Sequence, residues 1–510
     1  MVKSTVKPDL VIAGPGAGKT TAMVNQIINV LPDLKPFRCL STITYTNSAC
    51  SIIKTRLQSQ TPIPKNVFIT TIHHFLNEAI IIPYASIYNI AGLEKMFIDL
   101  NLEDIVNAKA ERYKKTPYYF AQKNVIKKRM TDKMLSEGKI PLSLIGNLAS
   151  ELMEIKIVRE IVSLKYQFLF IDEFQDVDPK QFFVFESIRK TNKTSIYAVG
   201  DPEQFIMSYT YRGQKTHSFS NIPINTWDTN KKTISDNFRS YKEIVDFTNL
   251  FNNQIQQVSQ KGSNSDSSVN FINKLDIKEI IAYYQRYCSA IFHKNPSQVF
   301  DLFYLSYENK TFEPFADEFG IKPLNSERQN RNTAFDNCLD LILHILGKTK
   351  HQAFETHNLD ELQLRKLCIK IIDQIKQKTI TNMSQIIDML HNCGLAFEAS
   401  EYFVVDNNKI QKIFQEFYDT PTTQNNHYFS SIHKAKGLEA DAVLVIANTT
   451  NELTKWINTN QEERSMDKID ACRIGYVAFS RAKQILFISC LQQVDASTIS
   501  KLEEFNVKIH

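Results

Sequence analysis

The sequence predicts an α/β protein whose parallel sheets are covered by helices. Short apolar runs of strand length, such as residues 10–12 and 168–171, are followed by polar loops. The pattern after the first run, TAMVNQIINVL at residues 21–31, is typical of an amphipathic helix. Strands that alternate with helices favour a parallel sheet. A length of 510 residues allows several cores, so we expect two to four domains.

Composition excludes several other classes of protein. Hydrophobic residues make up 43% of the chain and charged residues 23%, as in ordinary soluble proteins. The net charge of +5 permits a basic groove without arguing for one. The 8 cysteines have no C-x-x-C spacing, so we expect reduced, buried thiols in a cytoplasmic protein rather than a zinc site or disulfides. The N-terminus lacks the shape of a signal peptide, and we expect no membrane span.

A phosphate-binding loop follows the first predicted strand. Residues 13–20, AGPGAGKT, match G-x-x-x-x-G-K-T with Ala13 in place of the first glycine. Backbone N–H groups at the start of the following helix can cradle phosphates, and Lys19 would neutralise them. The Thr20 hydroxyl would bind Mg²⁺. A chance glycine-rich turn is the weaker alternative. The predicted ATP-binding residues of this loop are Gly14, Gly16, Ala17, Gly18, Lys19, Thr20 and Thr21.

Two acids end a second buried strand. The segment YQFLFIDEFQD, residues 166–176, delivers Asp172 and Glu173 at the carboxyl end of that strand, where parallel sheets place ligands. Asp172 would hold Mg²⁺, and Glu173 would orient and deprotonate the attacking water. Adjacent acids also occur as plain edge residues. Because a phosphate loop is present as well, we favour the functional interpretation.

A third loop combines an amide, an aromatic ring and a guanidinium. The segment YAVGDPEQ, residues 197–204, ends on Gln204, and Tyr211 and Arg212 follow within the same loop.

Seven segments together resemble the motifs of the UvrD/Rep-type superfamily 1 DNA helicases. IDEFQDVD and VGDPEQ…YRG resemble motifs II and III. The phosphate loop precedes them, and five further segments resemble motifs Ia, Ib, IV, V and VI: TYTNSACSIIKTRL (44–57), TTIHHF (70–75), SDNFRS (235–240), SIHKAKGLEADAVLVI (431–446) and RIGYVAFSRAKQILFIS (473–489). All stand in the family order. The resemblance implies two RecA-like lobes with reduced helical inserts.

The resemblance also implies roles for single residues. Charge that develops on the γ-phosphoryl group during hydrolysis would be stabilised by fixed polar groups. The matching positions are Gln204, Arg212, Arg239 and Arg481. Phe238 would stack on adenine, although it is also a possible core residue, and Glu439 would bind the ribose.

Single-stranded DNA would be held by stacking and backbone contacts. Tyr45 and Tyr211 match positions that stack bases in the family. His433 matches one that faces DNA or the motif III loop. The remaining matches to sugar-phosphate contacts are Thr44, Asn47, Thr71 and His73. A metal site at the adjacent His73 and His74 is disfavoured, because neighbouring side chains point apart.

Three departures from the family pattern leave questions open. Residues 1–10 contain no glutamine to read adenine, so other nucleotides than ATP stay possible substrates. Motif III is two residues longer than usual between Gln204 and Tyr211, which we expect to alter coupling to DNA rather than abolish hydrolysis. The start of motif VI is reduced to DACR, residues 470–473.

The resemblance places the lobes and inserts as follows. The first lobe takes residues 1–76 and 160–220, with insert 77–159, and the second takes 221–324 and 428–510, with insert 325–427. Apolar spacing in CLDLILHIL (338–346) and LCIKIIDQI (367–375) predicts a helix-bundle core in the last insert. The basic helix around KNVIKKRM (123–130) would line a DNA path or form a solvated face.

The predicted function is ATP- and Mg²⁺-dependent 3′–5′ translocation on single-stranded DNA. The short inserts make the chain most similar to the helicase-like subunit of the Gabija anti-phage system, which implies an OLD-family nuclease subunit with a Toprim domain as partner in a hetero-oligomer. Two alternatives stay open. One is a nucleotide-gated sensor of DNA ends that licenses a partner nuclease without processive unwinding. The other is a stand-alone DNA repair helicase.

Overall fold

A computed structural model describes most of the chain, which divides into two compact units. The described residues are 9–88, 106, 109–114, 116–136, 140–206, 230–252, 254–292, 300–324, 334–346, 357, 361–377, 379–380, 382–395, 426–466 and 470–510. The first unit comprises residues 1–75, 153–328 and 424–510, and the second comprises 76–152 and 329–423. Tyr211 and Arg212 lie outside the described residues.

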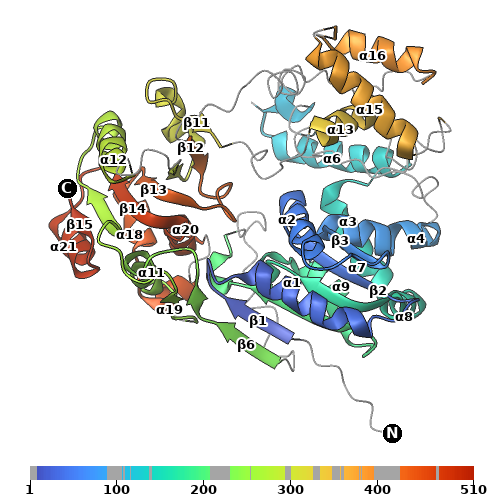
Figure 1. Ribbon diagram of the computed structural model, residues 1–510, viewed down its shortest axis with the longest axis horizontal. Coiled ribbons are helices and arrows are strands. Elements are labelled where there is room, and N and C mark those ends of the chain that lie inside the picture. The colour runs from blue at the N-terminus through green and yellow to red at the C-terminus, as the bar shows by residue number, and fades with distance from the viewer. Residues whose placement is uncertain are drawn as a thin grey trace. The chain divides into compact units, whose positions relative to one another are not determined.

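The first unit contains a six-stranded parallel sheet with strand order β3-β2-β4-β5-β1-β6 (Figure 1). Its strands are β1 (Asp9–Ala13), β2 (Cys39–Thr44), β3 (Val67–Thr71), β4 (Tyr166–Ile171), β5 (Ser195–Gly200) and β6 (Asn230–Ile234). The buried run predicted at residues 168–171 is confirmed as part of β4. β6 pairs with β1 although it follows residue 220, the predicted end of the first lobe, so this sheet draws a strand from beyond that limit.

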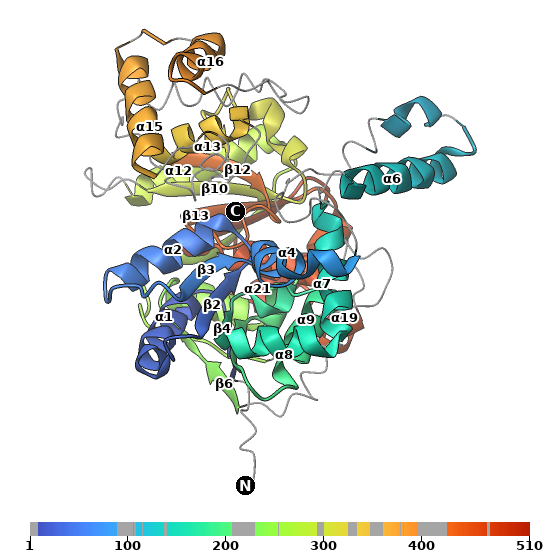
Figure 2. The ribbon, with the colours of Figure 1, turned by 90° about the vertical axis from the view of Figure 1, so that its right-hand side faces the viewer.

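Helices cover both faces of this sheet (Figure 2). They are α1 (Lys19–Val30), α2 (Asn47–Gln58), α3 (Ile72–Leu76), α8 (Lys156–Lys165) and α9 (Pro179–Arg189). The helix predicted after the phosphate loop is confirmed as α1. Its buried side chains Met23, Val24 and Ile27 share one core with Val11 and Val199 of the sheet. Burial on both faces explains the continuous apolar run at residues 10–13 of β1, whereas the edge strand β6 (NKKTI) is polar and mostly exposed.

A second parallel sheet, with seven strands in the order β11-β12-β10-β13-β14-β9-β15, lies in the same unit. Its strands are β9 (Ser268–Ile272), β10 (Asp301–Ser306), β11 (Lys322–Pro323), β12 (Asn426–Ser431), β13 (Ala440–Ala447), β14 (Ala482–Cys490) and β15 (Lys508–Ile509). Five of the six residues of β10 (DLFYLS) are buried. The two short strands β7 (Asp236–Asn237) and β8 (Val258–Ser259) pair with each other.

Successive residues of β13 belong to different cores on the two faces of the second sheet. Val443 and Val445 belong to one core, whereas Leu444 and Ile446 belong to the other. This alternation is the two-residue period of a strand. The helices of this part are α11 (Lys242–Asn249), α12 (Ile277–Phe292), α18 (Thr450–Trp456), α19 (Gln461–Met466), α20 (Ala471–Phe479) and α21 (Ala496–Glu504).

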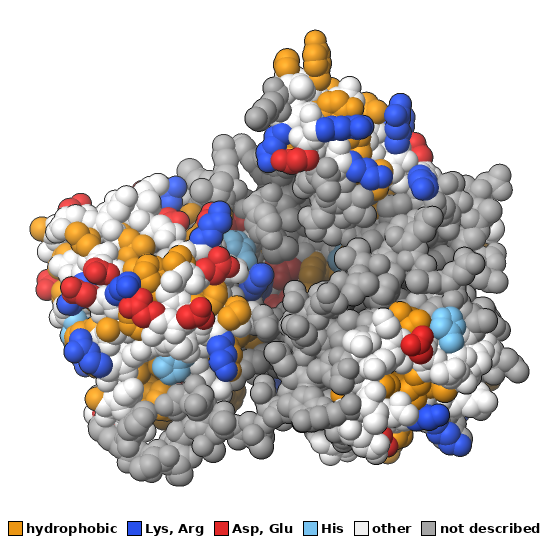
Figure 3. All heavy atoms as spheres, turned by 90° about the horizontal axis from the view of Figure 1, so that it is seen from above, with side chains coloured by type: hydrophobic (Ala, Val, Ile, Leu, Met, Phe, Trp, Pro, Cys, Tyr) orange, Lys and Arg blue, Asp and Glu red, His pale blue; other side chains and the backbone are white. Residues whose placement is uncertain are grey.

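The second unit is helical in its described residues. Its longer helices are α6 (Tyr119–Ser136), α7 (Leu142–Glu154, whose last residues fall in the first unit), α13 (Ala334–Leu346), α15 (Glu361–Lys376) and α16 (Met383–Asn392). Ile342, Ile371 and Leu390 share one core across α13, α15 and α16, so the helices predicted at 338–346 and 367–375 are confirmed. Lysine and arginine side chains lie among acidic ones on the described surface seen in Figure 3. None of the described helices combines the length and hydrophobicity needed to cross a bilayer.

Candidate active site

The phosphate loop joins β1 to α1 through glycines in unusual backbone conformations. Gly16 and Gly18 have φ of 73° and 76°, in the left-handed region that disfavours other residues. Gly18 is also the N-cap of α1, so the first backbone N–H groups of this helix have no partner within it. The Lys19 ammonium donates to the carbonyl oxygens of Ala13 and Gly14, at 3.2 and 3.3 Å. These groups could bind phosphate oxygens.

Asp172 and Glu173 follow β4 at its carboxyl end, and their pKa values are shifted in opposite directions. Burial, together with repulsion from Glu173, raises the pKa of Asp172 to about 7. Burial also opposes ionisation of Glu173, but Lys19 and Lys436 outweigh it and hold the pKa of Glu173 below its usual range. An ionised Glu173 can act as a general base at neutral pH. Its φ of 47° is uncommon for a residue with a side chain.

Gln175 connects this acid to the neighbouring strand end. Its Nε2 donates to Glu173 Oε2 at 2.5 Å, and its Oε1 accepts from the backbone N–H of Asp201 at 2.9 Å. A Cβ on Gly200 would lie 2.4 Å from Gln175 Oε1. Only glycine therefore leaves room for this bridge. The bridge makes the loops after β4 and β5 one hydrogen-bonded structure.

Gln204 and Arg481 are joined by a hydrogen bond although 277 positions separate them in the sequence. Arg481 Nη2 donates to Gln204 Oε1 at 3.1 Å, and Gln204 Nε2 donates to Asp201 Oδ2 at 2.8 Å. Arg481 also donates to the carbonyl oxygens of Val477 and Leu438. Burial, with Arg239 close by, lowers the pKa of Arg481 to about 9. Its charge near Glu173 helps to keep that acid ionised.

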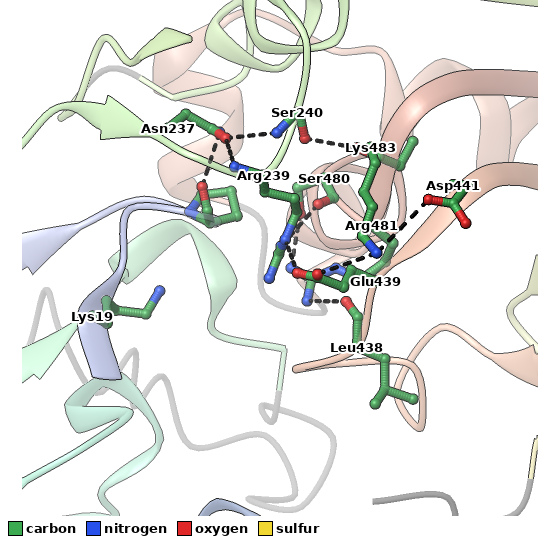
Figure 4. A network of polar contacts seen from close by, with 12 residues as sticks. Lys19, Asn237, Arg239, Ser240, Leu438, Glu439, Asp441, Ser480, Arg481 and Lys483 are labelled. Atoms are coloured by element: carbon green, nitrogen blue, oxygen red, sulfur yellow. Dashed lines mark hydrogen bonds and ion pairs between the residues drawn. The ribbon is translucent and has the colours of Figure 1, made fainter. Parts of the chain in front are cut away.

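Arg239 is held by an acid from the second sheet. Its Nε donates to Glu439 Oε2 at 2.7 Å and its Nη1 to the carbonyl oxygen of Ser480 at 3.1 Å. Lys483 approaches the other oxygen of Glu439 at 3.4 Å. Figure 4 shows Arg239 and Arg481 side by side around Glu439, with the Lys19 side chain separate from this network. Glu439 is therefore engaged with two cations, and its role at the ribose stays a prediction.

The segment around Phe238 lies against the phosphate loop. The backbone N–H of Phe238 donates to the carbonyl oxygen of Gly16 at 2.9 Å, and Asn237 Nδ2 donates to that of Pro15 at 3.0 Å. The Phe238 side chain is 57% exposed, and a Cβ on Gly18 would lie 3.8 Å from its ring. An exposed ring beside the loop is available for stacking, which is the role predicted for it.

A lysine from motif V pairs with an acid from motif II. Lys436 Nζ donates to Asp176 Oδ1 and Oδ2 at 2.7 and 2.5 Å. Burial raises the pKa of Asp176 to about 6, and Lys436 limits that rise. The backbone carbonyl of Asp176 accepts a hydrogen bond from the Tyr45 hydroxyl.

The predicted DNA-contacting residues that the structure describes lie at or after strand ends, with differing exposure. Thr44 is buried, and its hydroxyl bonds the carbonyl oxygen of Thr46 in its own turn at 3.0 Å. Asn47 is exposed at the start of α2, whereas the other members of this group are partly buried: Tyr45, Thr71, His73 and His433. The His433 ring packs edge-on to Tyr307 with centroids 5.6 Å apart. The DNA contacts themselves stay predictions.

The donor set suits a hard cation bound together with a substrate. The Thr20 hydroxyl and the Asp172 carboxylate are oxygen donors, which Mg²⁺ prefers. Within the described ranges, no group of three His, Cys, Asp or Glu side chains forms a metal site. Mg²⁺ commonly takes one or two protein ligands and completes its shell with phosphate oxygens and water. These residues fit that mode of binding.

Five residues of this network are not among the predicted site residues: Gln175, Asp176, Glu203, Lys436 and Arg464. Four of them stand inside the segments that resemble family motifs, and that position is the sequence signal that marks them. Arg464 lies outside every motif, and no sequence signal marked it.

Two protein-family models match successive parts of this chain. A family model described as AAA domain matches residues 2–210, and one described as UvrD-like helicase C-terminal domain matches residues 267–493. The Gabija protein GajB of Bacillus cereus strain VD045 is 23% identical over 496 residues, which cover 94% of this chain and 92% of that protein. A probable DNA helicase II homolog of Mycoplasma capricolum is 23% identical over 480 residues, covering 80% of this chain and 64% of that protein.

A further relative is similar to this chain along most of its length. The ATP-dependent DNA helicase PcrA of Staphylococcus aureus strain Mu50 is 21% identical over 607 aligned positions, covering 96% of this chain and 82% of that protein. The two matched domains follow each other in the order that the motifs predict. The first contains every strand of the six-stranded sheet except β6, and the second contains every strand of the seven-stranded sheet except β15. The chain belongs to the UvrD-like superfamily 1 helicases.

Proposed function

We propose that this protein is a DNA-dependent ATPase that moves 3′ to 5′ along single-stranded DNA. One observation carries the proposal: the Arg481 guanidinium, from the segment before β14, hydrogen-bonds Gln204 in the turn after β5 and helps to ionise Glu173. A base, an amide and a cation from two sheets thus converge beside the phosphate loop. Fixed cations near a transferring phosphoryl group lower the barrier to hydrolysis.

In this proposal, different residues of the chain bind the phosphates, activate water and stabilise charge during ATP hydrolysis. The N–H groups at the start of α1 and the Lys19 ammonium bind the phosphates of ATP. Ionised Glu173 accepts the proton of the attacking water, and Gln175 holds its carboxylate in place. Arg481 and Arg239 stabilise charge that develops on the transferred group. Thr20 and Asp172 would hold Mg²⁺, which when bound neutralises part of the phosphate charge.

The test compares ATP hydrolysis by three forms of the protein, with and without single-stranded DNA. We expect DNA to stimulate hydrolysis by the wild type. Lys19→Ala should weaken ATP binding, and Glu173→Gln should retain binding while hydrolysis falls by roughly 10²- to 10⁴-fold, the usual contribution of a general base. DNA-stimulated hydrolysis that survives in both variants would show that the site is wrongly assigned.

We further propose that the protein acts in anti-phage defence with a nuclease partner of the OLD family. The support is similarity to a Gabija protein along nearly the whole of both chains. A gene for such a nuclease beside this gene, and co-purification of the two products, are the expected observations.

Sensing of DNA ends without processive unwinding is the alternative within this setting. Strand displacement by the isolated chain would favour the free motor. Normal DNA stimulation without displacement would favour the sensor.

A further inference from the structure

A buried ion pair joins helix α19 to the turn that carries Gln204. Arg464 of α19 has 2% of its side chain exposed, and its Nη2 lies 2.8 Å from Glu203 Oε2. Its Nη1 donates to the carbonyl oxygens of Asn458 and Cys472, at 3.1 and 3.4 Å. The two partners of the pair are 261 positions apart in the sequence. Three acceptors from separate segments therefore fix this guanidinium.

Glu203 stands next to a residue of the proposed catalytic group. The turn η7 (Pro202–Gln204) is closed by Asp201, whose Oδ1 accepts from the N–H of Glu203 at 3.1 Å and whose carbonyl oxygen accepts from the N–H of Gln204 at 3.0 Å. Gln204 then reaches Arg481 on the other side. A shift of Glu203 would carry the Gln204 side chain with it, because only one peptide bond separates them.

Helix α20, which follows α19 in the chain, contacts Asp201 at the start of the same turn. The Tyr476 hydroxyl of α20 lies 3.4 Å from Asp201 Oδ2, and Asn252 Nδ2 donates to that hydroxyl at 2.9 Å. These contacts hold Asp201, whereas the carboxylate of Glu203 is paired with Arg464. A buried ion pair contributes little net stability, since desolvation offsets the attraction, but it can fix one geometry among several.

We propose that Arg464 is a positioning residue for ATP hydrolysis, which acts through Glu203 to place Gln204 against Arg481. The inference rests on the proposed ATPase function. Arg464 does not itself touch the substrate. It ties the amide of the first sheet to the segment preceding α20, which also leads to Arg481. The amide and the guanidinium are thereby supported by one framework, and loss of the pair should affect the hydrolytic step more than ATP binding.

The experiment replaces both partners at once, in Glu203→Gln/Arg464→Met. Removal of both charges avoids leaving one buried charge uncompensated, so the variant should fold. We expect kcat for ATP hydrolysis to fall roughly tenfold to a hundredfold, the effect of a small misplacement of catalytic groups, while KM for ATP changes little. Hydrogen exchange of the amides of residues 203–205 should become faster.

Two further variants separate positioning from general damage. Glu186→Gln/Arg189→Met removes a partly buried pair on α9 and should leave kcat and exchange at residues 203–205 as in the wild type. Arg464→Lys keeps the charge but lacks the planar fork of donors, so its kcat should lie between those of the wild type and the double variant.

Wild-type kcat and wild-type exchange in the double variant, or a kcat loss equal to that of the α9 control, would overturn the proposal. If the proposed ATPase function itself is wrong, the wild type will lack ATP hydrolysis, and this result distinguishes the two failures. In that case faster exchange in the double variant would still show that Arg464 orders the turn, and unchanged exchange would show that it does not.

Discussion

Asp172 and Glu173 are adjacent in the chain, yet the structure gives them opposite ionisation behaviour. Both are buried, which disfavours charge on either one. Glu173 receives the cations Lys19 and Lys436 and a hydrogen bond from Gln175, so it stays ionised and Asp172 carries the higher pKa. Such a separation of two neighbouring carboxyl groups assigns them different roles. Glu173 is suited to be the base, and Asp172 needs a cation to become fully ionised.

Asp172→Asn should raise the stability of the nucleotide-free protein at pH 8. The folded-state pKa of Asp172, about 7, lies above its unfolded value, so ionisation costs stability above pH 7 and the cost disappears as pH falls toward 4. Asparagine keeps an oxygen to accept from the N–H of Glu173. Urea midpoints should therefore exceed those of the wild type at pH 8 and converge with them near pH 4, while ATP hydrolysis is lost. An equal gain at both pH values would contradict this account. Asp33→Asn, at an exposed position, is the control.

The strand ends of the first sheet explain how separate motifs form one site. β1, β2, β3, β4 and β5 are all parallel, so the loops that follow them emerge at the same edge. The turn after β4 lies directly against the end of β5, where Gly200 leaves room for Gln175. The second sheet contributes residues from the amino ends of its strands, because Glu439 and Arg481 immediately precede β13 and β14.

Gly200→Ala should slow hydrolysis by displacing the Gln175 side chain from its bridge between the loops after β4 and β5. The new methyl group would lie 2.4 Å from Gln175 Oε1 and 3.1 Å from the backbone nitrogen of Phe174. Overpacking of this kind costs about 1–3 kcal/mol of unfolding free energy. Loss of the Gln175 bridge should also lower kcat. Chemical denaturation and steady-state ATP hydrolysis measure the two effects, and a variant that matches the wild type in both would show that the bridge is dispensable.

The two sheets of the first unit are joined by charged and polar contacts between distant segments. Arg481 meets Gln204, Arg464 meets Glu203, and Lys436 meets Asp176. Each contact links a loop of the first sheet to a segment of the second. In a helicase such contacts would respond to nucleotide and DNA, because binding changes the charges that they surround.

Lys436→Met should destabilise the protein in a pH-dependent manner. Without the lysine, the pKa of Asp176 would rise further above its unfolded value, so the penalty relative to the wild type is present at pH 8 and disappears as pH falls through about 6, where Asp176 becomes protonated in both folded proteins. Breaking one partner of a buried pair costs about 3 kcal/mol; side-chain exposures of 14% and 8% place this pair near that class. Urea unfolding between pH 4 and pH 8 measures the effect.

Two companion variants test the cause of this destabilisation. Lys436→Met/Asp176→Asn should recover most of the loss, because no buried charge remains. Lys242→Met breaks an exposed pair with Asp246 and should cost less than about 1 kcal/mol. A pH-independent loss in Lys436→Met would mean that packing of the lysine, rather than its charge, is responsible.

The local parts of this site could be predicted from the amino-acid sequence. The phosphate loop, Asp172 and Glu173 each lie beside a strand that supplies its own signal, since strand, turn and helix patterns are short-range. The resemblance added Gln204, Arg239 and Arg481, and their mutual placement in the structure is consistent with those roles. The pairs that join segments more than two hundred residues apart, such as Arg464 with Glu203, became visible only in the folded structure. Their geometry depends on how two sheets pack, and no local pattern encodes that distance.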